Sequence, residues 1–381
     1  MKRSRVLAGI TGFCVLCAVL SGCSDSSDSS DSGNSGTESS VAMNQVQYLG
    51  THNSYKQLLR RDLFEILTSF VPDVARTLDY GHLPLAEQFT SQGIRQIELD
   101  VFHDPKGGLY SERQALVLVG EAPASGIPAL DEPGLKVLHV QEIDYETSCY
   151  TFLGCLREIR NWSDDNPDHL PMLVLVEAKD AVIDDPLDLG FTIPLAFDAA
   201  ALDAIDEEVL SIFSTESLIT PDWVRGQRAT LEEAILTDGW PSLDQARGRV
   251  MFALDNGGST RDKYIEGHPS LAGRVLFTDS EPGTPEAAFI KKNDPADYMA
   301  IQELVRLNYM VRTRADAETE QARTGDTTRR DTALLSGAQW ISTDYPVADM
   351  RFTDYKVSIP GDNIARCNPV NLPADCQDSD L

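Results

Sequence analysis

The sequence predicts a single (β/α)8 barrel of the TIM type, and three observations carry this prediction. Apolar runs of strand length alternate with segments of helical periodicity, which is typical of parallel α/β folds. Eight such runs occur, the number that a TIM-type barrel needs. Each run ends in polar residues, and barrels keep their functional groups at the carboxyl ends of their strands. A doubly wound open sheet is the alternative, although no G-x-G-x-x-G or Walker loop supports a nucleotide-binding version.

The predicted elements share two signals. Strands are short and rich in Val, Ile and Leu, and helices carry apolar residues about every 3.6 positions. The strands are expected at 46–52, 94–102, 135–140, 171–179, 249–256, 274–279, 309–314 and 338–345. The helices are expected at 58–70, 83–92, 147–162, 198–213, 230–236, 295–307 and 327–335.

Composition divides the 381-residue chain into four segments. Residues 1–22 are typical of a lipoprotein signal peptide, and 23–45 of a disordered tether rich in Ser and Asp. The barrel domain is expected at 46–350, followed by an irregular C-terminal tail at 351–381. The formal net charge of -28 argues against nucleic acid as a partner and against simple electrostatic docking on anionic lipid. We expect a monomer.

The N-terminal segment predicts export. Basic residues precede an apolar run, 6–20, that is short for a membrane span. The letters LSGC at 20–23 resemble the lipobox of bacterial lipoproteins, in which the cysteine is lipidated. Ser24 resembles the sorting signal for the outer membrane. We therefore expect a lipid anchor on Cys23 that holds the protein at the bacterial cell envelope, with an ordinary secretory signal as the alternative.

The remaining cysteines fit an exported protein. Two short-range pairs, Cys149 with Cys155 and Cys367 with Cys376, suit an oxidising compartment. Other connectivities stay open. Zinc is a weaker alternative, because no C-x-x-C pair or neighbouring histidine accompanies these residues.

Oxygen ligands gather at the predicted strand ends. Asn53 follows the first strand, and Glu177 lies near the end of the fourth. Glu98 and Asp100 are two residues apart in the second strand and therefore share one face of it. Hard oxygen ligands suit Ca²⁺ or Mg²⁺. Three converging carboxylates would repel each other without a cation. Their placement in separate surface loops is the alternative.

Two histidines at predicted strand ends are the acid–base candidates. His52 follows the first strand and His139 lies near the end of the third, and imidazole titrates near pH ~6.5. His103 is a third candidate, directly after the acidic second strand.

Basic residues at other strand ends indicate an anionic, phosphorylated substrate. Lys179, Arg312 and Arg314 could hold phosphate oxygens. They could instead pair with acids, as Arg314 could with Asp316. No G-x-S-x-G elbow supports a serine hydrolase.

The motifs GTHNSY, GIRQIELDV, VLHV, LVLVEAKD and GAQWISTDYP, in this order, resemble the calcium-dependent bacterial phosphatidylinositol-specific phospholipases C. The resemblance covers about 46–346 and implies a TIM-like barrel. It implies catalytic roles for His52 and His139, with His139 as the general acid. By the same resemblance, the Ca²⁺ ligands are Asn53, Glu98, Asp100 and Glu177, and the residues that contact phosphate or inositol are Lys179, Arg312 and Arg314.

The resemblance implies a reaction on a phospholipid or another phosphodiester. The inositol 2-hydroxyl attacks the phosphorus, diacylglycerol leaves, and inositol 1,2-cyclic phosphate forms, with Ca²⁺ expected as the cofactor in preference to Mg²⁺. A glycerophosphodiester phosphodiesterase on the same barrel is the alternative, although that family opens with a His-Arg-Gly type motif. A surface lipoprotein that only binds its ligand is a further alternative.

Overall fold

The structure, a computed structural model, describes residues 41–373 and 376–381. The predicted signal peptide, the lipidation site Cys23 and most of the predicted tether lie outside the described residues. Met43–Gln45 form a short 3-10 helix, η1, in which Met43 is fully buried. The packed domain therefore includes residues before Val46, the predicted start of the barrel domain.

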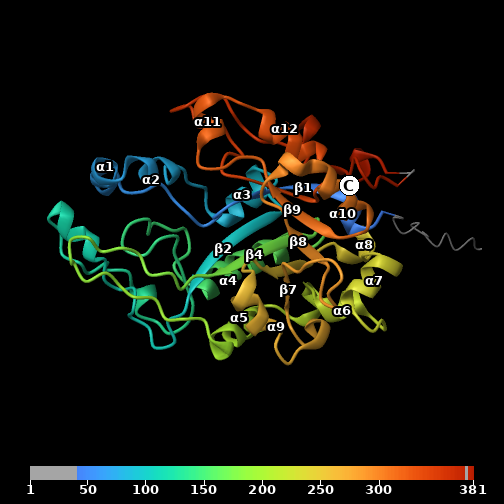
Figure 1. The fold of residues 1–381 in the computed structure, drawn as a ribbon, viewed down its shortest axis with the longest axis horizontal. Coiled ribbons are helices and arrows are strands. Elements are labelled where there is room, and N and C mark those ends of the chain that lie inside the picture. The colour runs from blue at the N-terminus through green and yellow to red at the C-terminus, as the bar shows by residue number, and fades with distance from the viewer. Residues whose placement is uncertain (1–40, 374–375) are drawn as a thin grey trace, which may run out of the picture. The chain divides into compact units, whose positions relative to one another are not determined.

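Eight parallel strands form a barrel within the described part of the chain, which confirms the predicted fold class (Figure 1). In order around the barrel they are β1 (Val46–Thr51), β2 (Gln96–Phe102), β4 (Met172–Ala178), β6 (Val250–Leu254), β7 (Leu276–Thr278), β8 (Phe289–Lys291), β9 (Met310–Arg314) and β10 (Trp340–Thr343). β10 pairs back with β1, and a parallel bridge between Asp279 and Phe289 closes the barrel between β7 and β8. At the β1–β2 contact Gly50 allows close approach, since a Cβ there would lie 2.1 Å from the Gln96 side chain.

One barrel strand differs from the prediction. The run 135–140 is expected as the third barrel strand, but Lys136–Val137 alone form a strand there, β3, which pairs antiparallel with the end of β2. Parallel pairing needs a long crossover, usually a helix, and the loop before β3 contains only 3-10 turns. β4 therefore pairs directly with β2, and the eighth barrel strand is β8, between β7 and β9, whose three residues are too short a run to predict. Two further short strands lie beside the barrel, β5 (Leu218–Ile219) against β6 and β11 (Ala365–Cys367) against β1.

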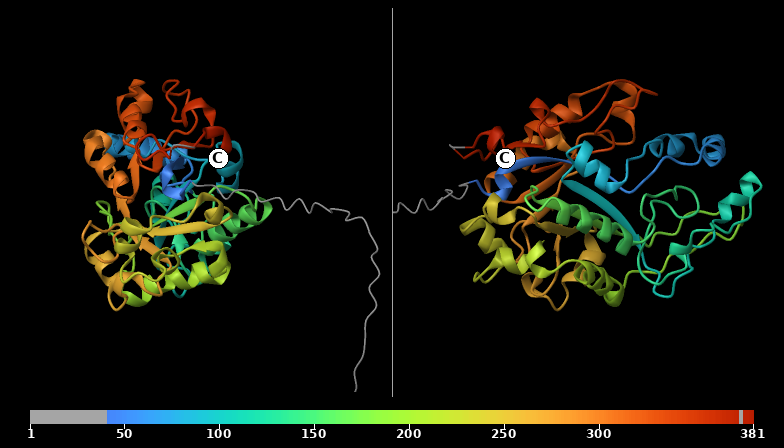
Figure 2. Two further views of the ribbon diagram at one scale, coloured as in Figure 1. Left: turned by 90° about the vertical axis from the view of Figure 1, so that its right-hand side faces the viewer. Right: turned by 180° about the vertical axis from the view of Figure 1, so that it is seen from behind.

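Most of the helices cover the outside of the barrel, as Figures 1 and 2 show. Their apolar faces pack on the strands in one continuous core. No helix in the described ranges is long and apolar enough to cross a membrane. The helices are α1 (Arg61–Phe70), α2 (Pro72–Thr77), α3 (Leu85–Ser91), α4 (Phe152–Asp165), α5 (Ala199–Ile212), α6 (Pro221–Arg225), α7 (Leu231–Thr237), α8 (Leu243–Ala246), α9 (Gly258–Ile265), α10 (Tyr298–Arg306), α11 (Glu320–Thr324) and α12 (Thr328–Leu335).

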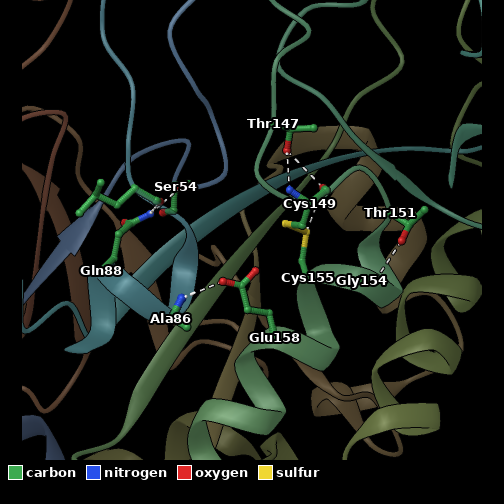
Figure 3. The surroundings of a disulfide bond; sticks show 10 residues. Ser54, Ala86, Gln88, Thr147, Cys149, Thr151, Gly154, Cys155 and Glu158 are labelled. Carbon is green, nitrogen blue, oxygen red and sulfur yellow. Dashed lines mark hydrogen bonds between the residues drawn. A yellow bond between two sulfur atoms is a disulfide. The ribbon is translucent and has the colours of Figure 1, made fainter. Parts of the chain in front are cut away.

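The first cysteine pair forms a disulfide at the start of α4 (Figure 3). The Cys149–Cys155 bond spans the helix N-terminus, where the Thr151 hydroxyl accepts a hydrogen bond from a backbone N–H of the first turn. The Glu158 carboxylate accepts a hydrogen bond from the Ala86 N–H at 2.9 Å, which joins α4 to α3. This region therefore links the segment before α4 to the barrel wall.

The C-terminal tail is mostly irregular but packed. Its strand β11 pairs antiparallel with the start of β1, and a second disulfide joins Cys367 to Cys376. Val357 and Ile359 are buried in the main core. β11 therefore covers the amino-terminal end of β1, whereas the Val357 N–H donates to the Tyr345 carbonyl just after β10 at 2.9 Å, so the tail contacts both ends of the barrel.

A group of loops and two helices extends from the carboxyl ends of β1, β2 and β4, as Figure 1 and the right view of Figure 2 show. We call it the rim lobe and define it as α1 and α2 with residues 103–150 and 180–197. The lobe has a small core of its own, formed by Phe102, Tyr110, Leu130, Leu138 and Tyr145. The end of β2 thus belongs to both the barrel and the rim lobe.

Candidate active site

The turn after β1 places His52 and Asn53 at the mouth of the barrel. The His52 N–H donates to the Thr343 carbonyl at the end of β10, at 3.1 Å. Asn53 has φ of 46°, a left-handed conformation that asparagine tolerates better than most residues. Its side-chain amide donates to the Tyr80 hydroxyl at 2.8 Å. The turn is therefore fixed by the neighbouring strand and by the segment before α3.

His52 forms a pair with Asp344, which directly follows β10. Its Nδ1 lies 2.8 Å from Asp344 Oδ1 and 3.2 Å from the Tyr80 hydroxyl. Its Nε2 lies 3.8 Å from Glu98 Oε1 on β2. Burial and the nearby Arg314 lower the pKa of His52, and the Asp344 and Glu98 carboxylates oppose this shift. A neutral imidazole oriented in this way can accept a proton at Nε2.

Asp344 is itself held by charged neighbours. Arg314 lies 3.2 Å from Asp344 Oδ2, and Asp316 accepts the Asp344 N–H at 2.8 Å. Burial would raise the pKa of Asp344, but His52 and Arg314 hold it well below its usual range. Burial and the adjacent Asp344 raise the pKa of Asp316 to about 7. Asp344 therefore stays ionised and Asp316 carries the proton more readily.

Carboxylates from three neighbouring strand ends converge beside His52. The sheet register places Asp100 on β2 opposite Glu177 on β4, and Asp255 follows β6 next to them. One carboxylate oxygen from each of Glu98, Glu177 and Asp255 lies within 4.8 Å of the other two. The predicted ligands Glu98 and Glu177 are therefore brought together, and Asp255 joins them where sequence reasoning had not placed a ligand.

The donor set fits a hard divalent cation. Asp100 is fully buried, and neither of its oxygens has a hydrogen-bond partner among the residues that the structure describes. The same holds for Oδ1 of Asp255. Burial raises the pKa of Asp100 well above its usual range, and the negative charges of Glu177 and Glu98 raise it further. Carboxylate oxygens without a hydrogen bond are free to coordinate a cation, and Ca²⁺ prefers oxygen ligands of this kind.

Three cations partly neutralise these acids. Lys179 Nζ lies 3.3 Å from Asp100 and 3.5 Å from Glu177, and Lys291 at the end of β8 lies 2.6 Å from Asp255. Arg312 lies 2.5 Å from Glu98 Oε2, and its side chain is only 1% exposed. Arg312 also donates to Asn293 and Ser342. Its guanidinium is therefore committed to protein groups, whereas Lys179 is 24% exposed and Arg314 is 16% exposed.

His139 enters the site from the rim lobe, not from a barrel strand. β3 pairs with the end of β2 and turns the chain back, so that His139 follows it over the barrel rim. His139 Nδ1 lies 2.6 Å from Asp144 Oδ2. Burial lowers the pKa of His139, and the hydrogen bond to Asp144 opposes the shift. The second histidine thus also has its Nδ1 bound by an aspartate.

Lys56 lies between the two histidine–aspartate pairs. It is fully buried, and its Nζ lies 3.3 Å from Asp144 Oδ2 and donates to the Tyr80 carbonyl at 2.6 Å. Tyr80 in turn contacts His52 through its hydroxyl. Lys56 therefore connects the barrel side of the site to the rim lobe.

Sequence reasoning missed Asp344, Asp144, Lys56, Tyr80 and Asp255 as members of the site. Two of them had a readable signal, since Asp344 and Asp255 end predicted strands. Asp144, Lys56 and Tyr80 lie in loops and carried none. The third histidine candidate, His103, packs near Phe197, with ring centroids 5.9 Å apart.

The comparisons with known proteins point to one family. The model of the family described as phosphoinositide phospholipase C, Ca²⁺-dependent, matches residues 41–369. No curated protein matches the chain.

Several solved structures are similar to this chain at low sequence identity, and those with a TM-score of at least 0.50 share its fold. A calcium-dependent phosphoinositol-specific phospholipase C from a Gram-negative Pseudomonas species, in its apo form, is 15% identical with a TM-score of 0.51, over 86% of this chain and 96% of that chain. A myo-inositol complex of a Pseudomonas enzyme is 14% identical with a TM-score of 0.50, over 86% and 95%. A Ca²⁺-dependent enzyme from Streptomyces antibioticus is 16% identical with a TM-score of 0.49, over 80% and 95%.

The barrel, the two histidines and the carboxylate cluster at its mouth define an α/β-barrel phosphodiesterase. The family match spans most of the described residues, and the chain belongs to the Ca²⁺-dependent phosphoinositide phospholipase C family. It is an enzyme of the phospholipase C type, and calcium is the cofactor of its family.

Proposed function

We propose that this enzyme cleaves phosphatidylinositol by intramolecular attack of the inositol 2-hydroxyl on the phosphorus. The 2-hydroxyl oxygen forms a bond to phosphorus, the bond from phosphorus to the glycerol oxygen breaks, and the products are inositol 1,2-cyclic phosphate and diacylglycerol. The observation that carries the proposal is the placement of two histidine–aspartate pairs beside a carboxylate cluster. Attack by a group already held on the substrate can gain roughly 7–11 kcal/mol over a free nucleophile.

The two histidines take opposite proton-transfer roles in this proposal. Asp344 binds Nδ1 of His52 and leaves Nε2 to face the carboxylates, where it would take the proton of the 2-hydroxyl. Asp144 binds Nδ1 of His139 and leaves its other ring nitrogen to protonate the departing glycerol oxygen. Each aspartate fixes the tautomer and the ring orientation of its histidine.

The proposed cation ligands are Glu98, Glu177 and Asp255, with Asn53 and Asp100 as the remaining predicted ligands. When bound there, Ca²⁺ would lower the pKa of the attacking hydroxyl and neutralise charge on the phosphoryl oxygens. An all-oxygen set that includes several carboxylates favours Ca²⁺ over Mg²⁺, which retains more of its water.

The predicted substrate-binding residues divide into two roles. Lys179 and Arg314 retain exposed surface beside the acids and are proposed to contact phosphate or inositol. Arg312 is buried against Glu98 and is proposed to orient that carboxylate, which replaces the expectation that it binds phosphate. The low-identity structural relative described as a myo-inositol complex supports an inositol headgroup as the ligand to test first.

Phosphorus NMR of the protein with phosphatidylinositol micelles tests the proposal. We expect a cyclic inositol phosphate signal with Ca²⁺ and its disappearance in EGTA. Turnover that persists in EGTA would contradict the calcium site. Release of glycerol 3-phosphate from glycerophosphodiesters, with no cyclic product, would instead establish the glycerophosphodiesterase alternative.

We further propose that the protein is exported and anchored to the bacterial envelope, in the outer membrane, through lipid on Cys23. The basic and apolar N-terminal segment and the LSGC letters support this. The pairing of Cys149 with Cys155 and of Cys367 with Cys376 supports an oxidising compartment. Metabolic labelling with palmitate should mark the wild type and not Cys23→Ala, and equal labelling of both would contradict the anchor.

A further inference from the structure

An apolar pocket lies in the rim lobe, separate from the carboxylate cluster. It encloses about 310 Å³, within the range in which proteins bind small organic ligands. Its walls come from α1, from the 3-10 helix η2 (Gln114–Val119) and from the loop at 184–191, and α1 packs directly on η2. The lining side chains include Leu63, Leu67, Phe70, Ala115, Leu187 and Leu189.

Large apolar side chains remain exposed where this pocket opens. Phe70 is 66% exposed, Leu187 is 49% exposed and Val71 is 42% exposed, and all three line the pocket. Leaving such surface in water forfeits the free energy that burial would give. A concave group of exposed apolar side chains marks a site that an apolar ligand or partner covers.

The walls of the pocket are held in place by buried polar contacts. Glu142 is 1% exposed, and its two carboxylate oxygens accept from the Gln114 N–H at the start of η2 and from the Thr192 N–H after the loop. Asp185 accepts backbone N–H groups of the same loop, including those of Leu189 and Gly190. The two walls are therefore joined through one carboxylate, and the cavity is formed before any ligand binds.

The segment 142–144 joins a wall of the pocket to the His139 side of the active site. Ile143 lines the pocket, and the residues on either side of it are Glu142, which joins the walls, and Asp144, which binds His139. The loop at 184–191 follows β4 a few residues after Lys179. The apolar cavity therefore lies on the side of the site where the proposed leaving group departs.

We propose that this pocket binds one acyl chain of the lipid substrate, with the glycerol end directed toward His139. This inference rests on the proposed function, because that function makes diacylglycerol the leaving group protonated from His139. The chain would contact α1, η2 and the 184–191 loop, and the inositol phosphate would lie at the carboxylates. Acyl-chain contact then fixes the lipid in the direction that the reaction requires.

The test compares substrates that differ only in their chains. The protein is assayed with dihexanoyl phosphatidylinositol below its micelle concentration and with glycerophosphoinositol, which has no acyl chains. The pocket variants are Leu67→Gln and Leu189→Gln, and the matched control is Leu335→Gln, a 55% exposed leucine at the end of α12, before β10. Binding of a dansyl-labelled fatty acid, followed by fluorescence, measures the pocket without turnover.

We expect both pocket variants to raise KM for the dihexanoyl lipid about tenfold or more, with kcat little changed. Their turnover of glycerophosphoinositol should match the wild type, which also shows that they are folded, and the fatty acid should bind the wild type and the control only. Unchanged KM for the monomeric lipid, with weaker binding to phosphatidylcholine vesicles, would overturn the acyl site in favour of a membrane contact. The wild type could also bind the fatty acid and turn over no inositol substrate. If the pocket variants then fail to bind the fatty acid, the result supports the pocket and refutes the proposed function.

Discussion

The two histidine–aspartate pairs look alike in local geometry but are built by different parts of the molecule. His52 and Asp344 follow adjacent parallel strands, and the sheet register of β1 and β10 sets their positions. His139 and Asp144 both lie in one loop of the rim lobe, which reaches the site by folding back along β2. One pair is thus positioned by the barrel and the other by a loop docked on it.

This difference determines what each aspartate must do. Asp344 pairs with His52 and with Arg314, whose side chain is partly solvated. Asp144 pairs with His139 and also with Lys56, whose ammonium group is fully buried. The same Asp-to-Asn change should therefore affect mainly turnover at the barrel pair, and both turnover and folding at the loop pair.

The largest expected effect is on turnover in Asp344→Asn. The amide cannot stabilise the imidazolium that forms when His52 takes a proton, so kcat should fall about 10³-fold. The rate is measured with phosphatidylinositol at saturating Ca²⁺, beside Asp165→Asn, an exposed aspartate at the end of α4. A loss of less than about tenfold would show that His52 needs no carboxylate partner.

The second effect is on stability in Asp144→Asn. Removal of this carboxylate leaves the Lys56 charge buried, which typically costs about 3–5 kcal/mol. Urea unfolding should show this loss, and Asp344→Asn should show a smaller one. The double variant Asp144→Asn with Lys56→Met should regain most of the stability but not the activity. An unchanged unfolding midpoint in Asp144→Asn would contradict the comparison.

The part of the site that lies on barrel strands could be predicted from the sequence. The alternation in β2 places Glu98 and Asp100 on one face, and apolar runs that end in polar residues locate His52 and Glu177. These positions follow from a period of two and from parallel register. They required no knowledge of which distant segments meet.

Contacts between distant segments, and the residues that lie in loops, could not be predicted in this way. The pairing of His52 with Asp344 joins residues 292 apart in sequence, although both still end strands. Lys56 and Asp144 have no periodic pattern, and their contact depends on how the rim lobe docks. β8 is too short to be recognised, and with it Lys291, which pairs with Asp255 across the mouth.

The third effect is a pH dependence of stability, and it arises at the start of the loop that carries His139. Glu208 on α5 accepts the Leu135 N–H at 2.8 Å, just before β3, and burial raises its pKa to about 7. The unfolded carboxyl has the lower pKa, near 4.5, so the unfolded state releases its proton first as pH rises. Ionisation therefore destabilises the fold progressively between about pH 4.5 and pH 7. Glu208→Gln keeps an acceptor for Leu135 and removes this effect.

We expect Glu208→Gln to be more stable than the wild type by about 2 kcal/mol above pH 8, with the advantage vanishing near pH 4. Thermal unfolding across this range measures it, and Glu207→Gln, an exposed neighbour on the same helix, is the control. A pH-independent difference would show that burial does not shift this carboxyl.

The smallest expected effect is on Ca²⁺ affinity in Asp255→Asn, and it distinguishes the role of Asp255 from the roles of the two histidine pairs. Its carboxylate lies with Glu98 and Glu177 and has an unpartnered oxygen, so Asp255→Asn should weaken Ca²⁺ binding about tenfold. Terbium luminescence and titration calorimetry read this directly, without turnover. Because neither histidine pair includes Asp255, kcat at saturating Ca²⁺ should change little. If kcat fell while the affinity stayed the same, Asp255 would act on the substrate or on Lys291, and the cation site would be confined to β2 and β4.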